Sequence, residues 1–128
     1  MKQVKVESIM RKPPVTSSPA DSVSFIAEKM RSFNIGAVII MSGDSPTGIV
    51  TERDIVEKVV GRRNPDKTRA EEIMSTPLVT IEADKTREEA LEIMKDKGIR
   101  RLGVTRNGEL VGILTERGVL GYYFPPVI

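Results

Sequence analysis

The chain of 128 residues contains no cysteine, no histidine and no tryptophan, and its aromatic residues are only two tyrosines and three phenylalanines. The missing cysteines exclude disulfides and thiolate nucleophiles. The missing histidines remove the commonest general base, and the two absences together exclude most zinc sites. An enzyme would have to work with carboxylates, lysine, hydroxyl groups or tyrosine, and no cluster of these points to a catalytic set. We therefore expect a protein that is not an enzyme and holds no metal.

Long apolar runs and a large excess of one charge are also missing. The longest apolar run covers residues 37–41, whereas a bilayer-spanning helix needs about 20 residues. The N-terminus lacks the apolar core of a signal peptide, so we expect a cytoplasmic protein without a membrane partner. A net charge of +2 is weak evidence for nucleic-acid binding. The apolar content of 39% and charged content of 30% fit one folded domain.

An internal repeat fills most of the chain. Residues of the first half return 64 positions later, in the same order. This period is too long for ankyrin or tetratricopeptide repeats. Two copies fill the sequence, so we expect one compact pseudo-twofold module with a ligand in the cleft between the copies. The matching segments are Ile9–Met10 and Ile73–Met74, Pro13 and Pro77, Val15–Thr16 and Val79–Thr80, Met30 and Met94, Ile35 and Ile99, and 48–54 and 112–118.

Hydrophobic periodicity and turn residues predict the same elements in both copies: helix, strand, helix, hairpin, helix. The first copy has predicted helices over 4–10, 23–33 and 54–60, strands over 15–16, 36–41 and 48–51, and a turn at 43–46. The 23–33 helix should bury one stripe that ends at Phe33, and the 36–41 strand should be buried on both faces. The second copy has predicted helices over 69–74 and 86–97 and from 116, and strands over 78–81, 102–105 and 110–115 around Asn107-Gly108. This pattern predicts an α/β fold.

This order and three motifs resemble the CBS domain family (named for cystathionine β-synthase), present as a tandem pair. The motifs are Ile-Met-x-x-Pro at 9–13 and 73–77, a hydrophobic-Thr strand at 15–16 and 79–80, and Gly-Ile-x-Thr-x-x-Asp at 48–54, altered at 112–118. Each is weak alone, but all three occur twice, in order and at a fixed spacing. The resemblance covers about residues 4–120. It implies one CBS-pair module over 1–128, with motifs at 2–61 and 69–121, a linker at 62–68 and an aromatic tail at 122–128.

The resemblance also implies a function. Each motif would be a small mixed sheet with helices on one face, and the two would pack sheet to sheet and often form a homodimer. Such pairs bind an adenosine-containing small molecule (AMP, ADP, ATP or S-adenosylmethionine) between the repeats. They regulate a partner protein, unknown here, and they have no catalysis and no cofactor of their own. The nucleotide would be a regulatory ligand.

Thr51 and Asp54 are the strongest candidate ligand contacts. Thr51 ends a predicted strand just before a predicted helix, where its hydroxyl and the free N–H groups of the first helical turn can bind phosphate. Asp54 lies one turn further on and can accept from both vicinal hydroxyls of a ribose. The resemblance implies the same two roles. The alternative is a plain helix cap, since Ser/Thr-x-x-Asp/Glu is also a capping box; both can hold in the empty protein.

The second copy has Gly118 in place of the aspartate. Thr115 remains, so we expect a weak second site around Thr115 and Arg117 beside the competent one. Arg53 and Arg117 occupy the same place in the two motifs and suit either a phosphate contact or a solvated helix start.

Arg100 and Arg101 replace Gly36 and Ala37 of the first copy. The resemblance places them at the cleft, where they could meet phosphates of the ligand held by Thr51 and Asp54. The alternative is a pair of surface arginines held by glutamates. The adenine would rest on backbone and apolar side chains that are also candidate core residues, namely Val15, Thr16, Ile35, Val79, Thr80 and Ile99.

Two further segments support a rival function, an interaction or nucleic-acid-binding protein that keeps the fold without sensing a small molecule. A basic linker contains Arg62, Arg63, Lys67 and Arg69, and the tail contains Tyr122, Tyr123 and Phe124. The linker also suits a solvated connection, and the aromatic residues suit packing on their own domain or on a dimer mate.

Overall fold

The computed structural model describes residues 3–123 and shows an α/β protein with two compact units, each built on a three-stranded sheet. One unit is Val15–Leu78, which we call the 15–78 unit. The other joins the N-terminal segment up to Pro14 with the chain from Val79 onward, and we call it the terminal unit. The predicted order of elements is confirmed in both copies of the repeat.

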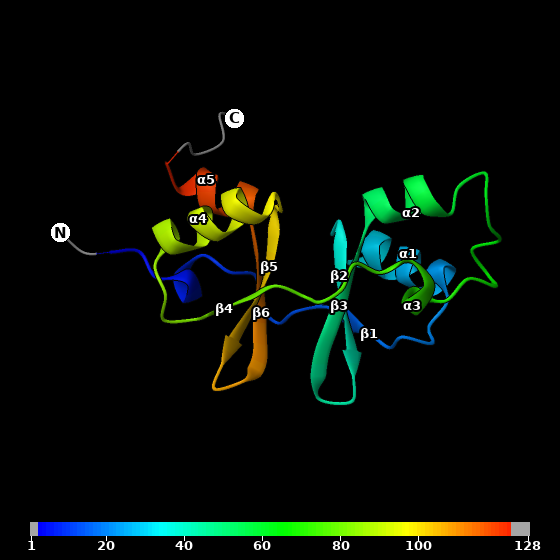
Figure 1. The fold of residues 1–128 in the computed structure, drawn as a ribbon, viewed down its shortest axis with the longest axis horizontal. Helices are drawn as coiled ribbons and strands as arrows, with labels where there is room; N and C mark the ends of the chain where they lie inside the picture. Colours follow the sequence, from blue (N-terminus) through cyan, green and yellow to red (C-terminus); the bar gives the residue numbers. More distant parts are fainter. Residues whose placement is uncertain (1–2, 124–128) are drawn as a thin grey trace. The chain divides into compact units, whose positions relative to one another are not determined.

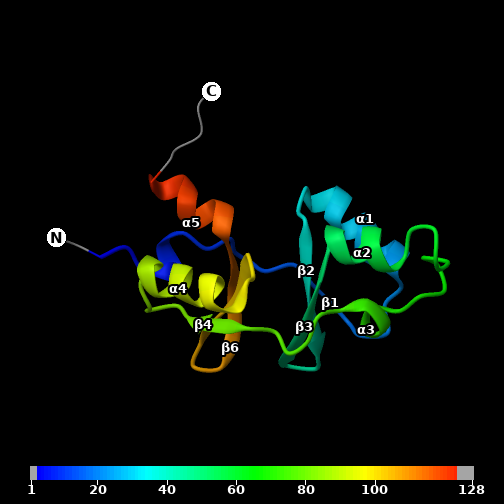
Figure 2. The same ribbon diagram turned by 45° about the horizontal axis from the view of Figure 1, so that its top comes forward.

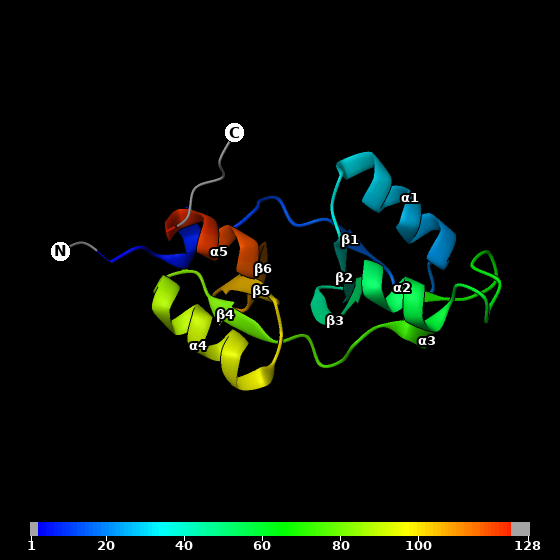
Figure 3. The same ribbon diagram turned by 90° about the horizontal axis from the view of Figure 1, so that it is seen from above.

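The 15–78 unit places its helices on one side of its sheet (Figures 1 and 3). Strand β1 runs parallel to β2, and β2 runs antiparallel to β3. Its elements are β1 (Thr16–Ser17), α1 (Val23–Phe33), β2 (Ala37–Ser42), β3 (Ser45–Thr51), α2 (Glu52–Lys58) and α3 (Ala70–Ile73). The core consists of Val23, Ile26, Met30, Val38, Ile40, Val50, Val59, Ala70 and Ile73.

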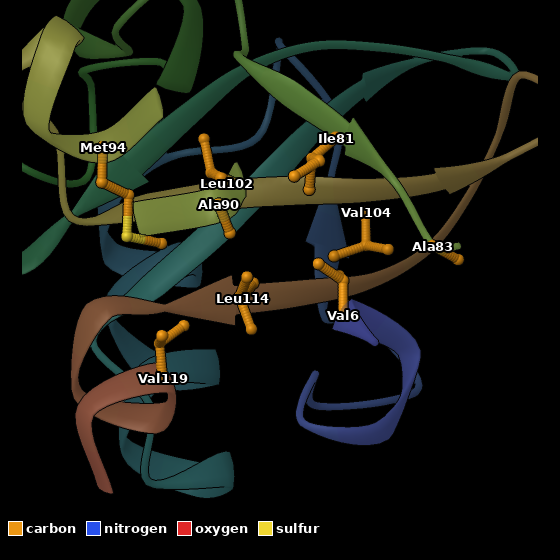
Figure 4. Packing of buried hydrophobic residues seen from close by; sticks show 9 residues of the cluster. All are labelled: Val6, Ile81, Ala83, Ala90, Met94, Leu102, Val104, Leu114 and Val119. Carbon is orange, nitrogen blue, oxygen red and sulfur yellow. The ribbon is translucent and has the colours of Figure 1, made fainter. Parts of the chain in front are cut away.

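The terminal unit repeats this topology, with β4 parallel to β5 and β5 antiparallel to β6. Its elements are the 3₁₀ helix η1 (Val6–Ser8), β4 (Thr80–Glu82), α4 (Arg87–Lys97), β5 (Arg101–Arg106), β6 (Glu109–Thr115) and α5 (Glu116–Tyr123). Figure 4 shows how its core side chains from the sheet, both helices and the N-terminal segment point toward one another. They are Val6, Ile81, Ala83, Ala90, Met94, Leu102, Val104, Leu114 and Val119.

The leading segment of each sequence repeat packs against the strands of the other repeat. In the terminal unit, the N–H groups of Val6 and Glu7 donate to carbonyls of the β4–α4 loop at 2.8 and 3.0 Å. Arg11 and Ile113 exchange two backbone hydrogen bonds, at 2.8 and 3.0 Å. The fully buried Val6 is part of that core. The first 14 residues therefore pack on a sheet whose strands lie more than 60 residues further along the sequence, and form hydrogen bonds with it.

The 15–78 unit shows the same exchange, 64 positions on. Ala70 N–H donates to the Asp21 carbonyl at 2.8 Å, and Ser75 and Ile49 exchange two backbone hydrogen bonds, at 2.9 and 3.1 Å. Helix α3 buries Ala70 and Ile73 in this core. The start of the second sequence repeat thus completes the sheet of the first.

The first glycine of each Gly-Ile-x-Thr motif allows this docking. A Cβ on Gly48 would lie 2.9 Å from both Met74 Sδ and the Ser75 carbonyl oxygen. A Cβ on Gly112 would lie 2.7 Å from Met10 Sδ and 2.8 Å from the Arg11 carbonyl oxygen. Only a residue without a side chain admits such close approach of a neighbouring backbone.

Local signals set most element boundaries. The Ser22 hydroxyl caps α1 by accepting from Phe25 N–H at 3.1 Å, and Asn34 ends the helix in the left-handed conformation. The predicted burial of Phe33 is wrong, because its side chain is 57% exposed. After the turn at Asn34, Ile35 N–H bonds the Met30 carbonyl and Ile35 packs on the core in its place.

Three predicted boundaries also differ from the structure. The predicted turn at 43–46 is too long, since β3 already begins at Ser45. Pro46 is tolerated there because the β2–β3 register shifts between Ile40 and Met41. The leading helix is only a 3₁₀ turn. The N–H groups of Val6 and Glu7 within it bond the β4–α4 loop, and the Arg11 N–H after it bonds β6 instead of continuing a helix. Helix α2 starts directly after Thr51, two residues before its predicted start, because Thr51 caps it. The double-sided burial of β2 is confirmed over Ala37–Ile40.

Candidate functional site

The first candidate site is the corner where β3 runs straight into α2 (Figure 2). Asp54 N–H donates to Thr51 Oγ1 at 3.2 Å, and Thr51 N–H donates to Asp54 Oδ2 at 2.9 Å. The Thr51 hydroxyl also donates to Asp54 Oδ2, at 3.0 Å. The two residues therefore form a complete capping box, as one interpretation of the motif predicted. Their contact with a ligand stays a prediction.

Burial distinguishes this corner from the other caps of the chain. Asp54 is 8% exposed and is the one ionisable residue among the buried residues of the described part. The corresponding carboxylates Glu72 and Glu89, in the caps of α3 and α4, are both exposed. The backbone hydrogen bond from Thr86 holds the pKa of Glu89 below its ordinary value of 4.5. A cap works at the surface, so capping does not by itself explain a buried carboxylate.

Lys58 completes the corner, and the sequence interpretation missed it. Its Nζ lies 3.0 Å from Asp54 Oδ1 and donates to the Ile73 carbonyl at 2.9 Å. The i,i+4 spacing of aspartate and lysine on a predicted helix was the available signal. A second signal was that both are lost together in the other copy, where Gly118 and Tyr122 stand.

The second corner lies between β6 and α5. Thr115 Oγ1 accepts from Gly118 N–H at 3.0 Å, so the threonine still caps its helix. The N–H of Glu116 donates to the Arg100 carbonyl at 2.8 Å, as Glu52 does to Gly36 in the first corner at 3.0 Å. The backbone frame is thus the same, whereas the capping carboxylate is gone.

The structure places Arg100 and Arg101, which are adjacent in the sequence, at this second corner. Arg101 lies directly opposite Thr115 across β5 and β6, so their side chains are neighbours on one face. Arg100 is exposed, with its Nε 3.9 Å from Glu116 Oε1, which agrees with the glutamate-paired alternative. Arg101 is half-buried and forms no ion pair with the residues that the structure describes. A phosphate contact by either arginine stays a prediction.

Arg53 and Arg117 both lie at the surface, one residue into α2 and α5. The Arg53 Nε donates to Glu57 Oε1 at 2.7 Å, and this hydrogen bond, together with the charge of Glu57, raises the pKa of the guanidinium further. Arg53 is thus already paired in a manner that suits a solvated helix start.

The candidate adenine contacts are divided between the two units. Val15 and Ile35 pack on the core of the 15–78 unit, and Val79 and Ile99 pack on that of the terminal unit. Thr16 is half-buried, with its carbonyl 2.5 Å from Lys29 Nζ, and Thr80 is exposed. Each apolar side chain therefore has a structural role, and its contact with a base stays a prediction.

The basic linker is partly neutralised. Arg63 lies 3.2 Å from Glu72 and Arg69 lies 3.7 Å from Glu71, whereas Arg62 and Lys67 are exposed. Within residues 3–123, no helix combines the length and the apolar character needed to cross a bilayer. Of the predicted aromatic tail, residues 124–128 lie outside the described residues, and Tyr122 and Tyr123 contribute backbone to α5.

Comparison with known proteins agrees with the repeat. The family model for the CBS domain matches residues 6–61 and again 70–124. An uncharacterized protein from Methanopyrus kandleri is 46% identical over an alignment of 123 residues that covers 94% of this chain and 63% of that protein. The chain thus spans somewhat less than two thirds of this relative's length.

Two solved structures are similar over nearly the whole chain. A CBS domain protein from Pyrobaculum aerophilum, complexed with AMP, is 26% identical, with a TM-score of 0.82 and coverage of 90% of this chain and 89% of that one. A hexameric CBS-CP12 protein from bloom-forming cyanobacteria is 26% identical, with a TM-score of 0.87 and coverage of 99% and 78%.

Proposed function

The chain belongs to the CBS domain family as a tandem pair, and from this premise we propose that it is a regulatory module that binds an adenine nucleotide and signals occupancy to a partner protein. Domains of this family are generally regulatory and not catalytic. The AMP complex of the Pyrobaculum aerophilum protein supports the choice of ligand. A ligand can signal only if it binds one arrangement of the protein better than another.

The observation that carries the proposal is the buried carboxylate of Asp54 at the start of α2. Vicinal ribose hydroxyls are two donors that a carboxylate can accept together, and such charge-assisted hydrogen bonds are the strong ones. The start of a helix also favours phosphate, and α2 starts beside this carboxylate. A nucleoside phosphate carries both groups.

The two corners differ in charge. The first offers the Asp54 carboxylate, whereas the second lacks it and has the unpaired Arg101 beside Thr115. The carboxylate of the first corner therefore suits sugar hydroxyls, and the guanidinium of the second corner offers an additional contact for phosphate. The second corner lacks a charge-assisted hydrogen bond, which costs about ten- to a hundred-fold in affinity, so one nucleotide per chain should bind tightly at the Asp54 corner.

We also propose that two copies of the chain associate through α1 and α2. Val56 on α2 and Val60 just after it are 64% and 63% exposed, and Phe25 and Phe33 on α1 are exposed as well. These helices lie on one side of the same sheet (Figure 3). Contiguous exposed apolar side chains mark association surfaces. The cyanobacterial CBS-CP12 protein is itself an assembly, a hexamer.

A thermal-shift panel tests the proposed function. AMP, ADP, ATP, S-adenosylmethionine, GTP and a short RNA are each added to the wild type and to Asp54→Ala. Saturation at a hundred times Kd adds about 2.7 kcal/mol of stability. A shift with an adenosine compound that is lost in Asp54→Ala is expected. A shift with RNA alone, weakening steeply with salt, would instead establish the nucleic-acid-binding rival.

A further inference from the structure

The hydrogen bonds around Asp54 leave too little room for a ribose. A carboxylate offers about four lone-pair sites. On Oδ2, both sites are filled by Thr51, one by its N–H at 2.9 Å and one by its hydroxyl at 3.0 Å. On Oδ1, Lys58 Nζ takes one site at 3.0 Å. A single site remains, whereas two vicinal hydroxyls donate two hydrogen bonds.

Of the two residues that bond the Asp54 carboxylate, Lys58 can be displaced with the smaller loss of stability. Its side chain is 43% exposed, so its ammonium group can move into water without being buried unpaired. The Thr51 bonds, by contrast, fix the first turn of α2 and end β3. Loss of these bonds would leave a buried oxygen and the helix start unsatisfied.

The same ammonium group also holds α3. It donates to the carbonyl of Ile73, the last residue of that helix, at 2.9 Å. Carbonyls at a helix end have no partner within the helix. Helix α3 has only four residues, and the Met74 N–H bonds the Ala70 carbonyl at 2.9 Å to close it. The chain passes from this unit to the terminal unit after Leu78.

We propose that Lys58 is a displaceable latch, a positioning residue that joins the nucleotide site to α3. In the empty protein, Lys58 occupies Asp54 Oδ1 and fastens the end of α3. The ribose replaces it on Oδ1, and the departing lysine releases the Ile73 carbonyl, so ligand binding loosens α3. This inference rests on the proposed function and adds the route by which occupancy leaves the site. The terminal unit has no such latch, because Gly118 and Tyr122 stand at the two positions.

Hydrogen–deuterium exchange of the full chain, with and without saturating AMP, tests the latch. The reporter is the Met74 amide, and the internal control is the Met10 amide, which bonds the Val6 carbonyl at the equivalent place. In the wild type, AMP should speed exchange at Met74 about three- to ten-fold, the effect of losing one hydrogen bond. Exchange at Met10 should not rise. A ligand that simply stabilises the fold would slow both.

Variants separate the latch from a general structural role. In Lys58→Met, exchange at Met74 should be fast already without AMP and should not change when AMP binds. Lys58→Arg should restore the response, and Lys95→Met on α4 should behave as the wild type does. Binding of AMP, lost in Asp54→Ala, with unchanged or slower exchange at Met74 overturns the latch and leaves the proposed function standing. Absence of any adenosine binding by calorimetry overturns both.

Discussion

Replacing Gly112 by alanine should destabilise the protein through one identifiable clash. The new Cβ would lie 2.8 Å from the Arg11 carbonyl oxygen and 2.7 Å from Met10 Sδ. The thioether can rotate away, but the Arg11 backbone is fixed by its two hydrogen bonds to Ile113. Forcing a methyl group into such a packed site costs about 1–3 kcal/mol. For a chain of this size we expect the melting temperature to fall by about 3–5 °C for each kcal/mol.

Thermal and urea unfolding of three glycine variants measure this. Gly48→Ala should be destabilised like Gly112→Ala, because its Cβ would meet the Ser75 carbonyl at 2.9 Å. Gly121→Ala is the matched control, since its Cβ meets nothing within 4 Å and lies in α5. There, alanine should stabilise the protein by about 0.5–1 kcal/mol. If all three variants changed stability in the same direction, the docking of the leading segments would not be the reason for the motif glycines.

Three further results are expected. The Ser18 backbone hydrogen bond, with smaller contributions from a serine hydroxyl and a lysine, holds the pKa of Asp21 below its ordinary 3.8, against the effect of burial. The Asp21 carboxylate therefore stabilises the folded protein above pH 3.8, and this stabilisation is lost as the pH falls through the lower pKa of the folded state. Urea midpoints of Asp21→Asn should be lower than wild type near neutral pH and should approach it in acid, and an unchanged difference contradicts this. Arg101→Ala should weaken ATP about ten-fold and adenosine much less, by calorimetry; equal losses refute a phosphate contact. Val56→Glu should shift sedimentation from dimer to monomer, whereas Lys95→Glu should not, and a wild-type dimer unaffected by Val56→Glu excludes this face.

The sequence was informative wherever a short segment determines its own conformation. Asn107-Gly108 predicted the β5–β6 hairpin, and both residues have positive φ, at 53° and 83°. The spacing of Val23, Ile26 and Met30 predicted the buried stripe of α1. These signals need only neighbours in the chain, because turns and helix faces depend on residues a few positions apart.

The sequence was uninformative where distant segments meet. Periodicity shows that 4–10 and 69–74 are short helical segments, but not which sheet each completes, since Val6 and Ala70 suit either core. Phe33 was assigned to the core because the helical spacing continues through it, whereas the left-handed Asn34 ends the helix and Ile35 packs on the core. The i,i+4 spacing indicates the pairing of Lys58 with Asp54, but its hydrogen bond to a carbonyl 15 residues away follows from no local pattern.

Calorimetry of AMP binding to the wild type, Asp54→Ala and Glu89→Ala tests the central claim most directly. The two variants each remove the carboxylate of a capping box, but only Asp54 is buried. We predict one tightly bound nucleotide per chain in the wild type and in Glu89→Ala, and a loss of ten- to a hundred-fold in Asp54→Ala, as for one charge-assisted hydrogen bond. Equal affinity in all three proteins, or two equivalent nucleotides per chain, would contradict a nucleotide site built on Asp54.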